Sequence, residues 1–163
     1  MEQREASKDA VMTRIGQAVM LLHGGDREEA RNRFGALWAE IGERGDALHR
    51  CTLAHYMADT QDDPEDELAW DLRALAAAEG LAGARPAEPA VSGDALAVRA
   101  FFPSLHLNLA ADYLTLRRTE AARTHLDRAW EAVGALDDDG YGEGVRAALG
   151  RLELRMGGSG TQR

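Results

Sequence analysis

The chain has 163 residues, of which 45% are hydrophobic, so it is long enough and apolar enough to bury a sizeable core. Its formal net charge of −9 argues against nucleic acid and acidic membrane surfaces as partners, because phosphate groups are bound by clusters of Lys and Arg. The single cysteine, Cys51, excludes an internal disulfide framework. Leu and Ala are far more frequent than Val, Ile, Phe and Tyr, and this bias favours helices over strands.

The sequence shows no sign of export or of a membrane anchor. Its opening residues, MEQREASKDA, are charged and lack the apolar core of a signal peptide. It contains no run of about 18 apolar residues, the length that a transmembrane helix needs. We therefore expect a cytoplasmic protein without a membrane partner.

Four helices are predicted in the first half of the chain from the spacing of their apolar residues. The first ends at a pair of glycines, and Asp26 starts the second, with Glu29 three residues on in the capping-box arrangement. Asp46 precedes the third, while Asp63 and Pro64 fit the N-cap and first position of the fourth, which runs to about residue 79. The apolar faces of these helices are Val11, Ile15, Ala18 and Leu22; Ala30, Phe34 and Leu37; Leu48, Cys51 or Thr52, Leu53 and Met57; and Leu68, Leu72 and Leu75.

The second half begins with an irregular connection over residues 80–93, which are rich in Gly, Pro and Ala. Helix resumes from Asp94, and Pro103 either kinks this helix or opens the next one. Two helices are predicted over residues 103–116 and 119–134.

A last amphipathic helix is predicted after the acidic turn DDDGYG, followed by a disordered tail over residues 157–163. Covering the exposed end of a helical stack is the role that we assign to this helix. Its apolar residues step by 4, 3 and 4 positions: Val145, Leu149, Leu152 and Met156.

Residues 104–134 carry a spaced motif that extends over two of these helices. The motif residues are His106, Leu109, Ala110 and Tyr113, followed by Ala122, Leu126 and Ala129. Their spacing resembles a tetratricopeptide repeat (TPR), in which W-x-x-L-G-x-x-Y in one helix is followed by A-x-x-x-F and a small residue in the next. The resemblance implies a right-handed stack of helix pairs that bury their apolar faces against one another.

The chain also resembles itself at a distance of 92 residues. The segment from Ala30 to Gly42 shares its Ala-Arg, apolar, Trp and Gly positions with the segment from Ala122 to Gly134. The match to the family is good for the third helix pair, partial for the first and degenerate for the second. We predict an all-α fold, a right-handed stack of three TPR-like helix pairs with a C-terminal capping helix, in a single domain over residues 1–156. A generic helical bundle is the alternative.

The resemblance further implies that the first helix of each pair lines a concave groove. The groove positions are Met12, Ile15, Val19 and His23; Leu48, Cys51, His55 and Asp59; and Ser104, Leu107, Asn108, Ala111 and Thr115. None is Lys or Arg, so the basic clamp with which some family members bind acidic C-terminal tails is missing. Many are apolar, which suits an apolar or helical segment of a partner. We predict a peptide- or partner-binding site with the polar anchors His55, Asp59, Asn108 and Asp112 and the apolar floor Ile15, Cys51, Leu107 and Ala111.

Other interpretations of these residues stay open. The apolar groove residues also suit packing against neighbouring helices or against the segment around Phe101 and Phe102. Two copies of the chain pairing through this surface is a further alternative. A small-molecule or metal-dependent activity centred on His55, Asp59 and Asp112 is the alternative from another class, since His and carboxylate at this spacing can hold a metal ion.

The residue types of a hydrolase triad are present, but their spacing along one helix does not form a catalytic site. Ser104 and His106 are two residues apart on one helix and point in different directions, so they form no hydrolase triad with Asp112. No phosphate loop or dinucleotide motif is present. We therefore predict a non-catalytic protein- or peptide-binding scaffold without a cofactor or a metal.

The three tryptophans, Trp38, Trp70 and Trp130, all fall on second helices of the predicted pairs. Their size suits the filling of gaps between adjacent repeats, and we favour this interpretation. An aromatic contact patch on the convex side is the alternative.

Overall fold

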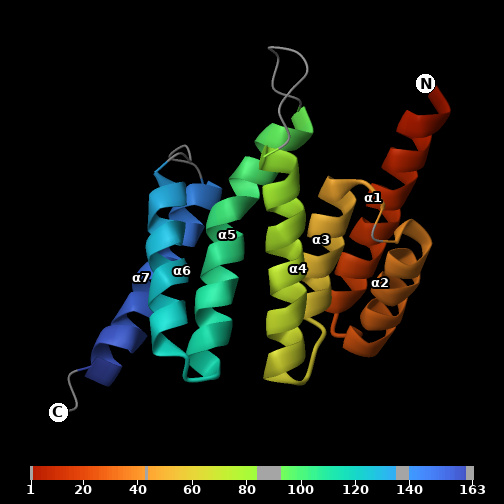
Figure 1. The fold of residues 1–163 in the computed structure, drawn as a ribbon. Coiled ribbons are helices and arrows are strands. Elements are labelled where there is room, and N and C mark those ends of the chain that lie inside the picture. Colours follow the sequence, from red (N-terminus) through yellow and green to blue (C-terminus); the bar gives the residue numbers. More distant parts are fainter. Residues whose placement is uncertain (1, 43, 84–92, 135–139, 161–163) are drawn as a thin grey trace. The chain divides into compact units, whose positions relative to one another are not determined.

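The structure is a computed structural model that describes residues 2–42, 44–83, 93–134 and 140–160 (Figure 1). These residues form seven helices and no strand, so the predicted all-α class is confirmed. Among these helices none combines the length and the apolar composition that crossing a bilayer requires. Their bounds are α1 Glu2–His23, α2 Arg27–Ile41, α3 Ala47–Ala58, α4 Pro64–Gly83, α5 Gly93–Thr115, α6 Thr119–Val133 and α7 Gly140–Gly160.

Three aspartates fix the starts of helices in the first half of the chain. The Asp26 carboxylate accepts a hydrogen bond from the amide of Glu29 at 3.4 Å. Asp46 accepts from two amides at the start of α3, at 3.0 and 3.3 Å, and Asp63 accepts from the amide of Glu65 at 2.9 Å. Each bond satisfies amide groups that the first turn of a helix leaves without a partner. The predicted starts of α2, α3 and α4 are therefore confirmed.

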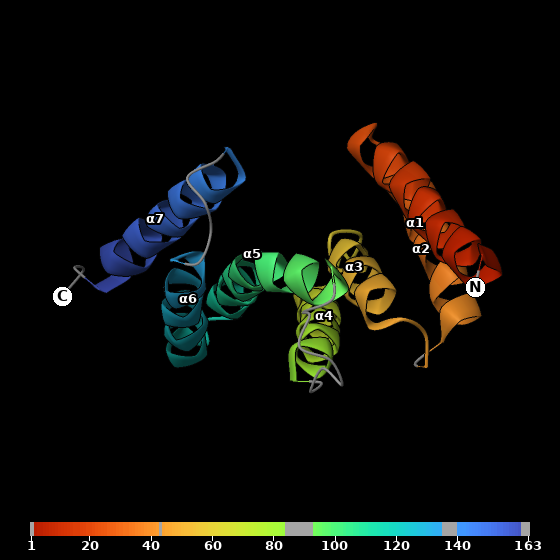
Figure 2. The ribbon, with the colours of Figure 1, turned by 90° about the horizontal axis from the view of Figure 1, so that it is seen from above.

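The chain divides into two compact units, residues 1–80 and residues 81–163, and each is described by itself. The single domain predicted for residues 1–156 stays a prediction. In the first unit α1 and α2 lie side by side in both views as a helical hairpin (Figure 1, Figure 2), and α3 packs against both of them. α4 joins this core through Trp70, which packs against it.

The second unit repeats this arrangement. α5 and α6 form a hairpin, and α7 packs against both of its helices. The ends of α2 and of α6 lie 92 residues apart at both termini, Arg27 with Thr119 and Ile41 with Val133. The three-helix pattern α1–α2–α3 therefore recurs as α5–α6–α7.

The two cores are built from the same positions. Every buried residue of the first core has a counterpart 92 residues later that lies in the second core or packs against it. The pairs are Ile15 with Leu107, Ala18 with Ala110, Ala30 with Ala122, Phe34 with Leu126, Leu37 with Ala129, Leu53 with Val145 and Met57 with Leu149. The self-similarity noted in the sequence over one helix thus extends over three.

Some boundaries differ from the expected ones. α5 runs as one helix through Pro103, so this proline does not open a new helix. α4 continues to Gly83 and α5 begins at Gly93, while the rest of the expected connection, residues 84–92, lies outside the described residues. α7 continues to Gly160, and residues 161–163 of the expected tail also lie outside.

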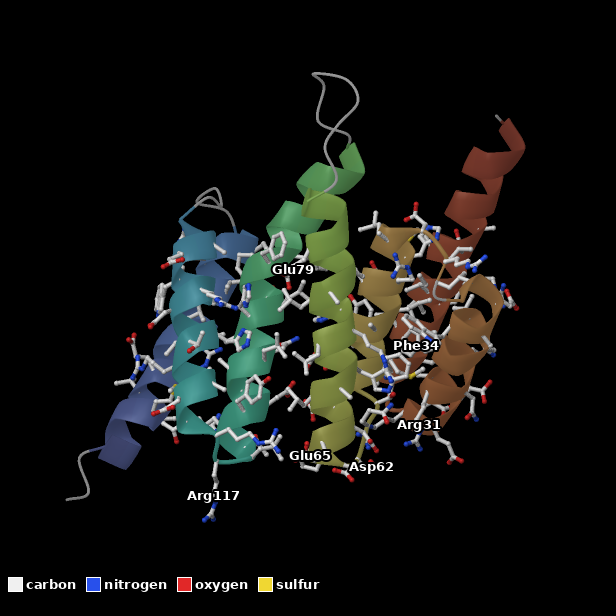
Figure 3. All side chains as sticks on the ribbon, viewed as in Figure 1. Arg31, Phe34, Asp62, Glu65, Glu79 and Arg117 are labelled. Atoms are coloured by element: carbon white, nitrogen blue, oxygen red, sulfur yellow. The ribbon has the colours of Figure 1, made fainter. Side chains whose placement is uncertain are left out.

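The turns that close the two hairpins are also equivalent. Asp26 donates its amide to the Leu21 carbonyl at 2.9 Å, and Arg118, 92 residues later, donates to the Tyr113 carbonyl at 2.8 Å. These are the bonds of a Schellman motif, which requires a left-handed residue just before the donor. That residue is Gly25, with φ of 95°, in the first unit and Arg117, with φ of 62°, in the second. Figure 3 shows Arg117 at the tip of its turn, with its side chain pointing away from the helices.

Because one turn has glycine and the other arginine in the left-handed conformation, we expect substitutions at the two positions to change stability in opposite directions. A non-glycine residue in the left-handed conformation costs roughly 1–2 kcal/mol, and glycine avoids most of this cost. We expect Arg117→Gly to raise the free energy of unfolding by about 1 kcal/mol and Gly25→Ala to lower it by about as much. Urea unfolding followed by circular dichroism measures both. A stabilising Gly25→Ala variant would contradict the assignment of these turns.

Candidate functional site

The eight residues of the predicted site fall on α1, α3 and α5. The first unit contributes Ile15 on α1 and Cys51, His55 and Asp59 at or after α3. The second unit contributes Leu107, Asn108, Ala111 and Asp112, all on α5. The metal-dependent alternative draws on both units, because His55 and Asp59 belong to the first and Asp112 to the second.

The end of α3 gathers titratable groups from three helices. His55 is half-buried, and Asp59 follows it by one turn. Burial lowers the pKa of His55, against the opposing effect of the Asp59 charge. Burial raises the pKa of Asp59, while His55, His23 at the end of α1 and Arg27 at the start of α2 act to lower it. A carboxylate beside an imidazole offers both acceptors and a donor for hydrogen bonds with a partner.

Arginines of α2 hold the turn that follows Asp59. Arg27 donates to the carbonyls of Asp59 and Gln61 and pairs with the Asp62 carboxylate. Arg31 donates to the carbonyl of Thr60 at 3.4 Å and lies 3.5 Å from the Asp62 carboxylate. Figure 3 labels Arg31 on α2 and Asp62 in the turn between α3 and α4. The position of Asp59 is therefore fixed by contacts with α2 that helical spacing alone does not reveal.

The apolar floor of the first unit is buried. Ile15 is 2% exposed and belongs to the first core, and Cys51 has no exposed surface. Burial also raises the pKa of the Cys51 thiol to about 12, so the thiol is protonated at neutral pH. These two residues act as packing that supports α1 and α3, as the alternative interpretation of the groove residues holds.

The α5 residues differ among themselves in exposure. Leu107 and Ala111 are half-buried and pack against the second core. Asn108 is half-buried, and Asp112 is buried. Leu107, Asn108 and Ala111 therefore each keep part of their surface accessible to solvent.

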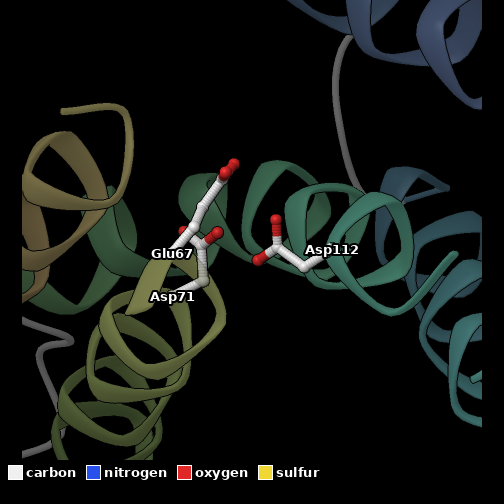
Figure 4. Close-up of side chains that lie close together, drawn as sticks. All are labelled: Glu67, Asp71 and Asp112. Carbon is white, nitrogen blue, oxygen red and sulfur yellow. The ribbon is translucent and has the colours of Figure 1, made fainter. Parts of the chain in front are cut away.

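α4 carries a buried carboxylate that was not predicted from the sequence. Asp71 is 2% exposed and follows Glu67 by one turn. Figure 4 shows Glu67 and Asp71 extending from α4, and Asp112 extending from α5. A carboxylate within the apolar series Leu68, Leu72 and Leu75 was the available signal, since acidic residues are seldom fully buried.

A pair of histidines lies inside the second unit. His106 of α5 and His125 of α6 are both buried, and their Nδ1 atoms are 3.0 Å apart in a hydrogen bond. Phe102 stacks on His106 with ring centroids 6.2 Å apart, and Tyr113 stacks on His125 at 5.4 Å. His125 was not predicted to be a site residue, although its place one turn after Ala122 and next to Leu126 puts it on the buried face of α6.

The histidine pair favours neutral rings. One Nδ1 must donate and the other accept, so adding a proton to the acceptor removes the bond. Burial lowers the pKa of His106 to about 4, and the nearby His125 and Arg128 add to this effect. Burial and Arg128 also lower the pKa of His125. The arrangement is therefore a packing element that is sensitive to acid.

Because the histidine pair needs neutral rings, we expect the folded protein to lose stability in acid. Because the folded pKa of His106 lies below the value of about 6.5 in the unfolded chain, its contribution is complete above about pH 6.5 and is lost as the pH falls toward 4. After allowing for solvent screening we expect roughly 2 kcal/mol from this residue. His106→Phe keeps the ring stack and removes the proton site, so urea unfolding should show a smaller decrease from neutral to acidic pH.

A control for this experiment is His23→Gln, which changes an exposed histidine of the first unit. It should retain the full decrease in acid. An unchanged pH dependence in His106→Phe would contradict the role of the pair.

Comparison of the chain with protein-family models, with curated proteins and with solved structures finds no match. The assignment of a function therefore depends on the geometry of each unit.

Proposed function

We propose that the protein is a non-catalytic scaffold that binds a protein or peptide segment on the first helices of a short TPR-like array. The supporting observation is the recurrence of a hairpin and following helix, with matched cores, in both units. Helical repeat proteins bury their apolar faces in this way, with each hairpin packed on the next helix. Binding partners along an extended helical surface is what such arrays commonly do.

The contact surface that we propose combines exposed polar and apolar groups. At the end of α3 it offers the Asp59 carboxylate, with His55 beside it and His23 nearby on α1. Met12 of α1 is 39% exposed and Leu48 of α3 is half-buried, so both can contact a ligand. Burial of apolar surface would supply most of the affinity, and the polar groups would fix the register.

The charge of this surface limits the kinds of peptide segment that can bind to it. The groove positions contain no Lys or Arg and include Asp59, so a strongly acidic segment would be repelled. We therefore favour a helical or extended apolar segment with a donor group placed to meet Asp59. A tail of several acidic residues is disfavoured.

The proposal is tested with peptides selected from a random library on the full chain. Within the first unit, we expect the tightest peptides to shift amide NMR signals of α1 and α3 more than those of α2. Asp59→Asn removes a charged acceptor and should weaken binding about tenfold, and His55→Ala, which removes the neighbouring imidazole, should also weaken it. Isothermal titration calorimetry measures both.

The matched control is Glu131→Gln, which removes a carboxylate from the exposed side of α6. It should leave the affinity unchanged. If Asp59→Asn and His55→Ala bound every selected peptide as tightly as this control, the proposed contact surface would be wrong.

A further inference from the structure

A cleft of about 600 Å³ lies within the first unit, among α2, α3 and α4. Its lining consists of Trp38, Arg50, Trp70, Arg73, Ala76 and Ala77. Trp38 belongs to α2, Arg50 to α3 and the other four residues to α4. None of them is among the groove positions considered above, so this is a separate surface.

Two tryptophan rings form an aromatic corner in the cleft. Trp38 and Trp70 meet edge to face, with ring centroids 5.1 Å apart and an angle of 87° between the planes. Both side chains are half-buried, so part of their surface faces solvent. The neighbouring Ala76 and Ala77 have small side chains, which let a flat group approach α4 closely. Such a corner suits the stacking of a planar ring.

Two guanidinium groups accompany this corner. The Arg73 guanidinium carbon lies 4.3 Å from the centroid of the Trp70 ring, in a cation–π arrangement. Arg50 donates from Nε to the Gly45 carbonyl at 2.9 Å. This bond uses one edge of the Arg50 group and leaves its terminal nitrogens to bind a ligand. A planar guanidinium held in this way matches a carboxylate or a phosphate.

The loop that anchors Arg50 is itself tightly placed. A Cβ atom at Gly45 would come within 2.8 Å of the Ile41 carbonyl oxygen and 2.9 Å of the Ile41 Cβ. Glycine is therefore the residue that allows this approach, and it sets the position of the carbonyl that Arg50 contacts.

The charge of the cleft is opposite to that of the chain. The lining residues include two arginines and no acidic residue, in a chain of net charge −9. No ion pair is found for Arg50 or Arg73 within the part of the chain that the structure describes. Two positive charges without acidic partners, next to aromatic faces, favour an anion that also carries a ring.

We propose that this cleft binds a small free molecule in which a carboxylate or phosphate is attached to a flat aromatic ring. The ring stacks in the corner of Trp38 and Trp70, and the anionic group pairs with Arg50 and Arg73. The volume supports a small molecule, since sites for such ligands measure about 300–1,000 Å³.

The first test is a titration of the full chain with 1-naphthoate, followed by the indole N–H signals in NMR. We expect the signals of Trp38 and Trp70 to shift. Trp130, on α6 of the second unit, serves as an internal reference that should not shift. 1-Naphthamide, which has the ring without the charge, and acetate, which has the charge without the ring, should each bind at least about tenfold more weakly. Equal binding of naphthoate and naphthamide would overturn the proposal.

The second test uses substitutions of the two arginines. Arg73→Gln removes a charge from an exposed side chain whose described contact is with the Trp70 ring, so the unit should remain folded. Arg50→Gln removes the other charge. Each should weaken naphthoate binding about tenfold. Arg151→Gln on α7 changes the net charge equally and should have no effect. Equal affinities for Arg73→Gln and Arg151→Gln would overturn the proposal.

A third experiment distinguishes a free small molecule from a protein terminus as the ligand of the cleft. A short peptide that ends in phenylalanine with a free carboxylate presents the same ring and charge on a chain. Tighter binding of naphthoate than of this peptide supports a free small molecule. Tighter binding of the peptide would reject that source and assign the cleft to a protein terminus.

Discussion

The burial of one apolar face of the middle helix against the helices before and after it in sequence governs both units of this protein. α2 lies against α1 and α3, and α6 lies against α5 and α7. A hairpin of two amphipathic helices cannot remove its whole apolar face from water, so the third helix is needed to complete each core. Ala30, Phe34 and Leu37 of α2 are buried at this contact, and their counterparts on α6 are Ala122, Leu126 and Ala129.

The shared core leaves other positions free to differ. Arg14 and Arg33 both line a cleft of about 240 Å³ in the first unit, and Arg14 pairs with Glu40 at 2.6 Å. The positions 92 residues later hold His106 and His125, which face each other within the second unit. At positions 14 and 106 the same backbone arrangement therefore carries different side chains. Arg14 is exposed and pairs with Glu40, whereas His106 is buried and pairs with His125.

Much of the fold could be predicted because its signals are local. The aspartates before α2, α3 and α4 act on amides two or three residues away, and apolar spacing along one helix identifies its buried face. The left-handed Arg117 could not be predicted, because arginine has no preference for that conformation. The corner of Trp38 and Trp70 depends on how α2 and α4 approach each other, and the spacing of residues within either helix does not contain that information.

The candidate site was predicted only in part for the same reason. Spacing placed His55 and Asp59 on one face of α3, but it could not reveal that Arg27 holds the turn after Asp59 or that Ile15 and Cys51 are buried. The burial of Cys51 has a practical consequence. Because this is the only sulfhydryl group of the chain and its pKa is about 12, very little thiolate exists at neutral pH to react with maleimide or iodoacetamide reagents. A cysteine introduced on any exposed helix face would then accept a fluorophore at that one position, and native Cys51 would not need to be replaced.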